Sequence, residues 1–312
     1  MEIVYDGTPF PRLAGGSAVA VGAFDGVHVG HRALIDELRR MAAERRGASV
    51  VATFDRHPAS VVRPESAPRL LTDLSRKLEL IAGTGVEYAY VIRFDEARSL
   101  EDPTHFVNDV IVGQLQARVV VVGEDFHFGH RRRGDVALLA QVGASEGFKV
   151  IGMGLVETPG IDGPVSSTAI RRALAAGEIT RARAMLGHPY EVRGVVEHGD
   201  GRGRALLGCP TANIAVAGDV MLPGDGVYGG WYTRPDGRRY RAAISIGRRP
   251  TFYEDSGLLL LEAHLVDFDG DLYGEVARVE VESWVHGQIR YESVEALAGQ
   301  LQDDIAAVRA SA

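Results

Sequence analysis

The stretch Gly22–His31, which reads GAFDGVHVGH, constrains the fold more than any other part of this sequence. Before it, residues 17–21 form a short apolar run typical of a buried strand. After it, apolar residues recur at helical spacing until Gly47. The stretch is therefore predicted to be a turn from a strand into a helix. Its glycines, Gly22 and Gly30 among them, let the backbone approach a ligand closely, and the free N–H groups at the start of a helix favour a phosphate.

Two histidines, His28 and His31, lie three residues apart at the predicted start of this helix and would share one side of its first turn. There they could hydrogen-bond and partly neutralise the phosphates of a nucleotide, as a His-x-Gly-His sequence does in nucleotidyltransferases. The alternative is that the glycines serve packing alone, as in many α/β domains. Two histidines that bracket a Val-Gly pair favour the nucleotide interpretation.

The first half of the chain alternates strand-like and helical patterns, which indicates a doubly wound parallel sheet. In such sheets ligands bind beyond the carboxyl ends of the strands. The histidine turn follows one predicted strand, and the segment 123–129, which contains Asp125, follows another. The further strands are predicted at 49–54, 88–94, 119–122 and 149–153, the helices at 72–82, 102–115 and 135–144, and the segment with Pro58, Pro64 and Pro68 is predicted to be a loop.

Three hydroxyl side chains, Ser166, Ser167 and Thr168, precede a helical pattern that contains Arg171 in its first turns. Helix capping accounts for one hydroxyl. It does not account for an arginine close to the positive end of a helix dipole. A bound phosphate chain would account for both features.

The pattern changes after a short predicted helix at 178–187. The strand-like stretches that follow have no helical pattern between them, which predicts a small antiparallel barrel or sandwich. The chain ends in a predicted helix at about 293–309. We therefore expect two domains, residues 1–187 and 188–312. The strand-like stretches are 190–197, 226–233, 240–246, 258–268 and 275–285.

The second predicted domain contains candidate site residues of its own. Gly201, Arg202 and Gly203 form a flexible basic loop that suits phosphates, or else a plain hairpin turn. The hydroxyl of Thr211 and the amide of Asn213 are hard oxygen donors suited to Mg²⁺. Glu262 interrupts an apolar strand, where an acid is costly unless it is paired, used in chemistry or turned outward.

Composition narrows the function classes. The net charge of −8 disfavours broad nucleic-acid binding, although residues 131–133 form a basic cluster that either meets phosphates or is a solvated loop. No apolar run approaches the roughly 20 residues of a membrane span, and no signal peptide is evident. The only cysteine, Cys209, indicates a reducing compartment, so we expect a cytoplasmic protein.

The chain resembles the bifunctional prokaryotic riboflavin kinase/FAD synthetase family, and the resemblance rests on eight motifs in order. The first four are Gly-x-Phe-Asp-Gly-Val-His-x-Gly-His at 22–31, Phe-x-x-His-Pro at 54–58, Gly-x-Asp-Phe-x-Phe-Gly at 123–129 and Ser-Ser-Thr-x-Ile-Arg at 166–171. The other four are Pro-Thr-Ala-Asn at 210–213, Asp-Gly-Val-Tyr at 225–228, Ile-Gly-x-x-Pro-Thr-Phe at 246–252 and Asp-Phe-x-x-Asp-Leu-Tyr-Gly at 267–274.

The resemblance implies two Mg²⁺-dependent reactions. The second domain would phosphorylate riboflavin with ATP to give FMN, and a nucleotidyltransferase Rossmann-like first domain would adenylylate FMN with ATP to give FAD and pyrophosphate. For the first domain it implies catalytic roles for His28, His31 and Arg171, and nucleotide or flavin binding by Gly22, Phe24, Asp25, Gly30, Asp125, Ser166, Ser167 and Thr168. For the second it implies Glu262 as the base that accepts the proton of the attacking hydroxyl, Thr211 and Asn213 at Mg·ATP, and nucleotide binding by Gly201, Arg202, Gly203 and Thr211.

Two positions depart from the family pattern. Cys209 stands where an aromatic residue is expected, and Arg248 stands where Thr is common. Two alternatives remain open: a single-activity adenylyltransferase for nicotinamide or pantetheine phosphate, and a flavin-binding regulator or carrier without catalysis. The attached Pro-Thr-Ala-Asn domain disfavours the first alternative. The presence of Glu262, Asn213 and both histidines disfavours the second.

Overall fold

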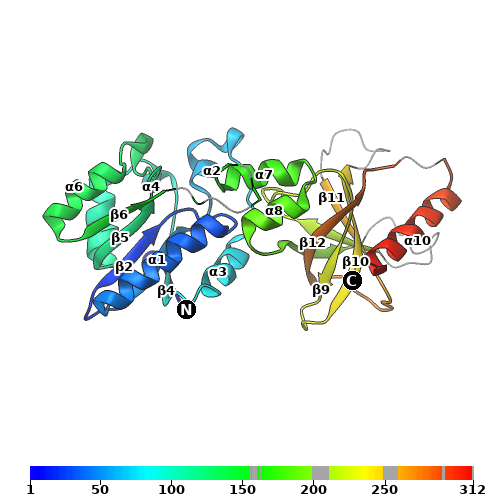
Figure 1. The fold of residues 1–312 in the computed structure, drawn as a ribbon, viewed down its shortest axis with the longest axis horizontal. Helices are drawn as coiled ribbons and strands as arrows, with labels where there is room; N and C mark the ends of the chain where they lie inside the picture. The colour runs from blue at the N-terminus through cyan, green and yellow to red at the C-terminus, as the bar shows by residue number, and fades with distance from the viewer. Residues whose placement is uncertain are drawn as a thin grey trace. The chain divides into compact units, whose positions relative to one another are not determined.

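The chain folds into two compact units, Met1–Ser167 and Thr168–Ala312, which are described one at a time (Figure 1). The structure is a computed structural model. It describes residues 1–312 except 155, 157–159, 162, 199–210, 249–258, 290–291 and 311–312.

The first unit is built on a six-stranded sheet with the order β1-β4-β3-β2-β5-β6, in which every neighbouring pair is parallel. This confirms the predicted doubly wound parallel sheet, although β1 had no counterpart among the predicted strands. The strands are β1 (Glu2–Tyr5), β2 (Ser17–Val21), β3 (Ala48–Phe54), β4 (Tyr88–Ile92), β5 (Ala117–Gly123) and β6 (Lys149–Met153).

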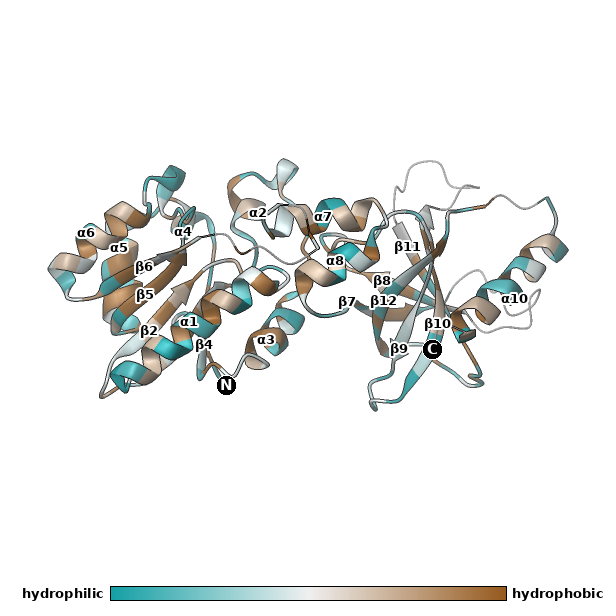
Figure 2. Cartoon of the chain, viewed as in Figure 1, coloured by the Kyte–Doolittle hydropathy of each residue, from teal (hydrophilic) through white to brown (hydrophobic). Residues whose placement is uncertain are grey.

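Helices cover both faces of this sheet, so alternate residues of one strand enter two different cores. Ala18 and Ala20 of β2 pack with apolar residues of α1 and α3. Val19 and Val21 pack on the other face with residues of α5, η2 and α6. In Figure 2 the interior strand β5 is mostly brown, whereas α1 alternates brown and teal. The helices are α1 (Val29–Arg45), α2 (Pro58–Val62), η1 (Pro64–Ser66), α3 (Leu74–Ala82), α4 (Glu96–Ser99), α5 (Pro103–Phe106), η2 (Val107–Gln114), η3 (His130–Arg132) and α6 (Val136–Glu146).

Two segments of this unit differ from the prediction. The proline-containing segment, predicted to be a loop, forms α2 and the short 3₁₀ helix η1. Pro58 stands at the start of α2, where its missing N–H costs nothing, and His57 caps that helix. The helix predicted over 102–115 begins as an α-helix capped by Asp102 but continues as the π-helix η2.

The second unit contains a closed antiparallel barrel with the strand order β10-β11-β8-β7-β12-β9, so the barrel is correct and the sandwich is excluded. The predicted terminal helix is present as α10. Strand β8, which begins with the Thr-Ala-Asn part of the Pro-Thr-Ala-Asn motif, was not among the predicted strands. The elements are α7 (Ser167–Ala175), α8 (Ile179–Leu186), β7 (Tyr190–Glu197), β8 (Thr211–Val216), β9 (Gly226–Thr233), β10 (Arg239–Arg248), β11 (Leu259–Leu265), β12 (Val276–His286) and α10 (Val294–Ala310).

Helix α10 packs on the outside of this barrel. Its Val308 is buried in a small apolar cluster with Ala243 and Val266. Its Asp304 accepts a hydrogen bond from Nε2 of His286 on β12 at 2.8 Å. Burial opposes the charge on His286, but the hydrogen bonds to the Gly287 carbonyl and to Asp304 raise its pKa. No helix among the described residues is long and apolar enough to cross a membrane.

Candidate active sites

The turn between β2 and α1 has a strained backbone. Phe24 and Val27 have positive φ angles of 48° and 37°, and Gly26 lies between them at 81°. A positive φ is uncommon outside glycine and is an outlier for a β-branched residue such as Val27. Strain of this kind persists where the surrounding structure enforces it, and it concentrates at functional sites.

Asp25 enforces the conformation of this turn. Its buried carboxylate accepts hydrogen bonds from the backbone N–H groups of Leu71, at 2.9 Å, and Thr72, at 3.1 Å. The Thr72 hydroxyl accepts the N–H of Gly26 at 3.2 Å, and the Ser167 hydroxyl donates to the backbone carbonyl of Asp25 at 3.0 Å. The structure thus brings together the predicted site residues Asp25 and Ser167 across 142 positions of sequence.

We expect Asp25→Ala to lower the free energy of unfolding of the first unit by about 3 kcal/mol, because two buried N–H groups lose their acceptor at about 1–3 kcal/mol each. Both tryptophans, Trp231 and Trp284, lie in the second unit. Urea denaturation followed by tryptophan fluorescence therefore reports on the second unit, and circular dichroism reports on both. The control is Asp36→Ala, because the Asp36 side chain is 69% exposed. Unfolding of Asp25→Ala at the wild-type urea concentration by both signals would contradict the assigned role.

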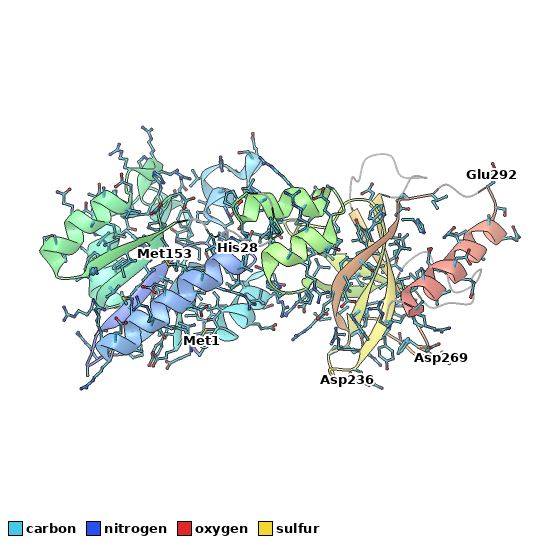
Figure 3. The ribbon with its side chains drawn as sticks, viewed as in Figure 1. Met1, His28, Met153, Asp236, Asp269 and Glu292 are labelled. Atoms are coloured by element: carbon cyan, nitrogen blue, oxygen red, sulfur yellow. The ribbon has the colours of Figure 1, made fainter. Side chains whose placement is uncertain are left out.

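His28 is the N-cap of α1 and stacks on His31. Its Nδ1 accepts the backbone N–H of His31 at 3.3 Å, and the two ring centroids are 3.6 Å apart. A Cβ atom at Gly30 would lie 3.2 Å from the His28 ring, so glycine at this position leaves room for the imidazole. Figure 3 shows His28 at the start of α1.

The His31 ring has an unused polar atom. Its Nδ1 is buried and has no hydrogen-bond partner among the residues that the structure describes. Burial lowers the pKa of His31 well below its usual range, and the charges of His28 and Lys77 lower it further. His31 is therefore neutral at pH 7, and a buried nitrogen without a partner is the kind of group that a ligand would satisfy.

The turn also lies where the strand order reverses. In the sheet, β2 lies between β3, which follows it along the chain, and β5. The carboxyl ends of β2 and β5 therefore mark the switch point, where sheets of this kind bind ligands. Asp125 is exposed in the segment after β5. The basic cluster of residues 131–133 follows it on the surface, with positive φ angles at Arg131 and Arg132.

The remaining predicted residues of the first site are distributed as follows. A Cβ atom at Gly22 would lie 3.2 Å from the Phe24 ring, so glycine leaves room for that ring. Ser166 precedes α7, which begins at Ser167, and Thr168 and Arg171 follow on the same helix.

In the barrel, the predicted kinase residues share one face of neighbouring strands. Glu262 of β11 is paired with Asn213 of β8 on one side and Ser245 of β10 on the other. Two residues along the strand, His264 is paired with Thr211. The intervening Ala212 and Ala263 are buried inside the barrel, so these side chains lie on its outer face.

His264 contacts the predicted metal ligand Thr211, whose hydroxyl lies 3.1 Å from its Nδ1. Burial lowers the pKa of His264 to about 4, which the nearby Asp304 carboxylate offsets only in part. This histidine is not among the predicted site residues, although its spacing of two from Glu262 places it on the same side of a strand. Lys77 is not among them either; it is a buried lysine whose Nζ donates to the carbonyls of Ala23 and Phe54.

Several predicted residues cannot be placed. Gly201, Arg202, Gly203 and Cys209 lie outside the described residues, as does the Pro-Thr-Phe part of the motif at 246–252. Arg248 ends strand β10, and its side chain is outside the description.

Comparison with known proteins identifies the family. Residues 11–169 match the family model of FAD synthetase, and residues 186–312 match that of riboflavin kinase. The bifunctional riboflavin kinase/FMN adenylyltransferase of Listeria monocytogenes is 36% identical over 287 residues, which cover 92% of this chain and 89% of that protein. The protein of the same name from Pseudomonas fluorescens is 37% identical over 297 residues, which cover 95% of this chain and 93% of that protein.

The chain belongs to the bifunctional riboflavin kinase/FMN adenylyltransferase family.

The order of the two family models along the chain matches the resemblance inferred from the eight motifs. A crystal structure described as a macrolide-efflux protein from Streptococcus pneumoniae has the same fold, with a TM-score of 0.85 and 28% identity over 99% of both chains. The family models leave residues 170–185 between them, whereas the contact-based division falls after Ser167. The boundary expected between residues 187 and 188 stays a prediction.

Proposed function

We propose that this riboflavin kinase/FMN adenylyltransferase phosphorylates riboflavin on the outer face of the barrel and adenylylates the resulting FMN at the β2–α1 turn. The observation that supports this most directly is that each unit has its own group of polar side chains suited to phosphates or their metal ion. The first unit has the stacked pair His28 and His31 at a helix start. The second has the paired residues Asn213 and Glu262.

In the adenylylation step, an oxygen of the FMN phosphate attacks the α-phosphorus of ATP and pyrophosphate leaves. The protein contributes positioning and stabilisation of the charge that develops on the phosphates. The free N–H groups of α1 and a neutral His31 provide hydrogen bonds to the triphosphate, while His28 holds the first turn of the helix. Ser166, directly before α7, and Thr168 and Arg171 on that helix stay predicted nucleotide-binding residues through their motif.

In the phosphorylation step, the terminal ribityl hydroxyl of riboflavin attacks the γ-phosphorus of ATP and ADP leaves. Glu262 accepts the proton of that hydroxyl as the bond to phosphorus forms. His264 orients the Thr211 hydroxyl, because its Nδ1 lies within hydrogen-bonding distance of the hydroxyl oxygen, at 3.1 Å.

The side chains on this face fit Mg²⁺. The Thr211 hydroxyl and the Asn213 side-chain carbonyl are hard oxygen donors on alternate residues of one strand, and both lie beside Glu262 or His264. When bound with ATP, the ion neutralises charge on the transferring phosphoryl group.

The test is incubation of the full-length protein with riboflavin, ATP and Mg²⁺, with separation of the flavins by chromatography. We expect FMN to form first and FAD to follow, and neither to form without Mg²⁺. Unchanged riboflavin would indicate a carrier. Formation of FMN without FAD would remove the proposed role of the first unit. Replacing FMN by nicotinamide or pantetheine phosphate tests the single-activity alternative, which leaves the riboflavin kinase match unexplained. The dependence on ATP and the single cysteine fit an enzyme of the cytoplasm.

A further inference from the structure

Lysine is almost absent from this protein. Of its 34 Lys and Arg residues, only Lys77 and Lys149 are lysines. Lys149 is exposed at the start of β6, whereas Lys77, on α3, is only 7% exposed. A lysine ammonium is a compact point charge with three donors, whereas an arginine guanidinium is a broad planar group. Position 77 is thus a buried position that carries the compact lysine cation, in a chain where nearly all basic side chains are arginines.

The Lys77 ammonium joins the ends of two neighbouring strands. Its Nζ donates to the carbonyl of Phe54, the last residue of β3, at 2.8 Å. It also lies 3.3 Å from the carbonyl of Ala23, which begins the strained turn after β2. The Thr53 hydroxyl donates to the same Ala23 carbonyl at 3.1 Å. The first residues of the turn are therefore fixed to the end of β3 by side-chain donors.

The charged groups around Lys77 come from three elements. Asp25 faces it from the turn, Asp55 from the segment after β3, and His31 from α1. Burial lowers the pKa of Lys77 to about 8, although both carboxylates act in the opposite direction. In its charged form Lys77 also disfavours protonation of His31.

We propose that Lys77 is a positioning residue of the adenylyltransferase site, which holds the turn carrying His28 and His31 against the end of β3. The inference rests on the proposed function of that turn. Hydrogen bonds from a charged donor are about twice as strong as neutral ones. The turn is therefore held most firmly while Lys77 carries its proton, and we expect FAD formation from FMN to decline as the pH rises through about 8.

The first experiment uses the full-length wild-type protein labelled with [¹³Cε]lysine. Its two lysine signals can be assigned with the Lys149→Arg variant. We expect the Lys77 signal to titrate near pH 8, at the midpoint of the alkaline decline in FAD formation from FMN. A decline whose midpoint is separate from this titration would overturn the inference.

The second experiment compares Lys77→Arg, Lys77→Met and the surface control Lys149→Met in the full chain. Arginine stays protonated throughout the assay range, so Lys77→Arg is expected to lose the decline near pH 8. Lys77→Met is expected to lower kcat for adenylylation about 10- to 100-fold, with little change in KM. This is the effect expected when one or two charge-assisted hydrogen bonds are lost. Lys149→Met should leave both activities unchanged, and riboflavin phosphorylation should persist in all three variants.

These experiments distinguish a failure of the role proposed for Lys77 from a failure of the proposed function. A wild-type kcat in Lys77→Met, or a wild-type alkaline decline in Lys77→Arg, would overturn the role of Lys77 alone. Absence of FAD formation by the wild-type protein would overturn the proposed function of the first unit and the inference with it. If either variant fails to fold, the comparison of titration and pH profile in the wild type decides the matter.

Discussion

Glu262→Gln is expected to slow riboflavin phosphorylation by about 10²- to 10⁴-fold, the usual contribution of a positioned general base. A primary hydroxyl is a poor nucleophile at neutral pH, and an amide cannot take its proton. Glutamine has the same size and still accepts a hydrogen bond, so riboflavin binding should change much less than kcat. Adenylylation of added FMN should persist, because the β2–α1 turn proposed for that reaction lies in the other unit.

The competing acids for this role are Asp267, Asp269 and Asp271, which lie in the loop between β11 and β12, where Figure 3 labels Asp269. Turn and surface contacts account for two of them. Asp271 accepts the N–H of Tyr273 at 3.0 Å, and Asp267 pairs with Arg309. Asp269→Asn is therefore the matched control and should phosphorylate riboflavin at the wild-type rate. Near-normal phosphorylation by Glu262→Gln would remove Glu262 from the mechanism and direct attention to this loop.

His31→Ala is expected to lower FAD formation about 100-fold, or about 3 kcal/mol in activation free energy, the usual effect of removing one preorganised donor to developing phosphate charge. His28 requires two substitutions, because it also caps α1. Asparagine is among the best N-cap residues, whereas alanine is among the poorest. His28→Asn therefore keeps the cap and removes the imidazole, and His28→Ala removes both.

The measurement is kcat for FAD formation from FMN and for FMN formation from riboflavin on the same purified variants, with exposed His105 replaced by Asn as the control. If the His28 imidazole contacts phosphate, His28→Asn and His28→Ala should lose similar activity. If His28 serves only as a cap, His28→Asn should be close to the wild type. Equal loss of both reactions would indicate misfolding, and full activity of His31→Ala would return the pair to a structural role.

The sequence predicted the local features of this protein better than its long-range contacts. The spacing of apolar residues and the turn residues are local signals. They missed β1 and β8, but the other strands of the sheet and the barrel and the glycine-rich turn could be read directly. The role of Asp25 could not. Its motif implied a ligand contact, which stays a prediction, but gave no sign that its carboxylate accepts backbone N–H groups 46 and 47 positions away. Only the folded chain shows which buried donors need an acceptor.

The proposed kinase site illustrates the same limit. Thr211, Asn213 and Glu262 were identified by residue type, but nothing local indicates that β8 pairs with β11. That pairing follows from the closed barrel, and it adds His264 to the site. The helical pattern around Lys77 does not predict its burial, because a single lysine in an amphipathic helix usually faces solvent. The structure buries it because two strand ends present carbonyls to the helix.

The strand order of the barrel has a consequence for synthesis on the ribosome. Strand β7 is the first barrel strand to emerge, yet its partner on one side is β12, whose register joins Tyr190 to Val281. One edge of strand β9 also pairs with β12 and stays unpaired until β12 has been synthesised. Until residue 286 has left the exit tunnel, a nascent barrel therefore has two unpaired edges, which are templates for pairing with other chains. We expect ribosome-bound chains that end before β12 to depend on chaperones, and chains extended beyond α10 to lose that dependence.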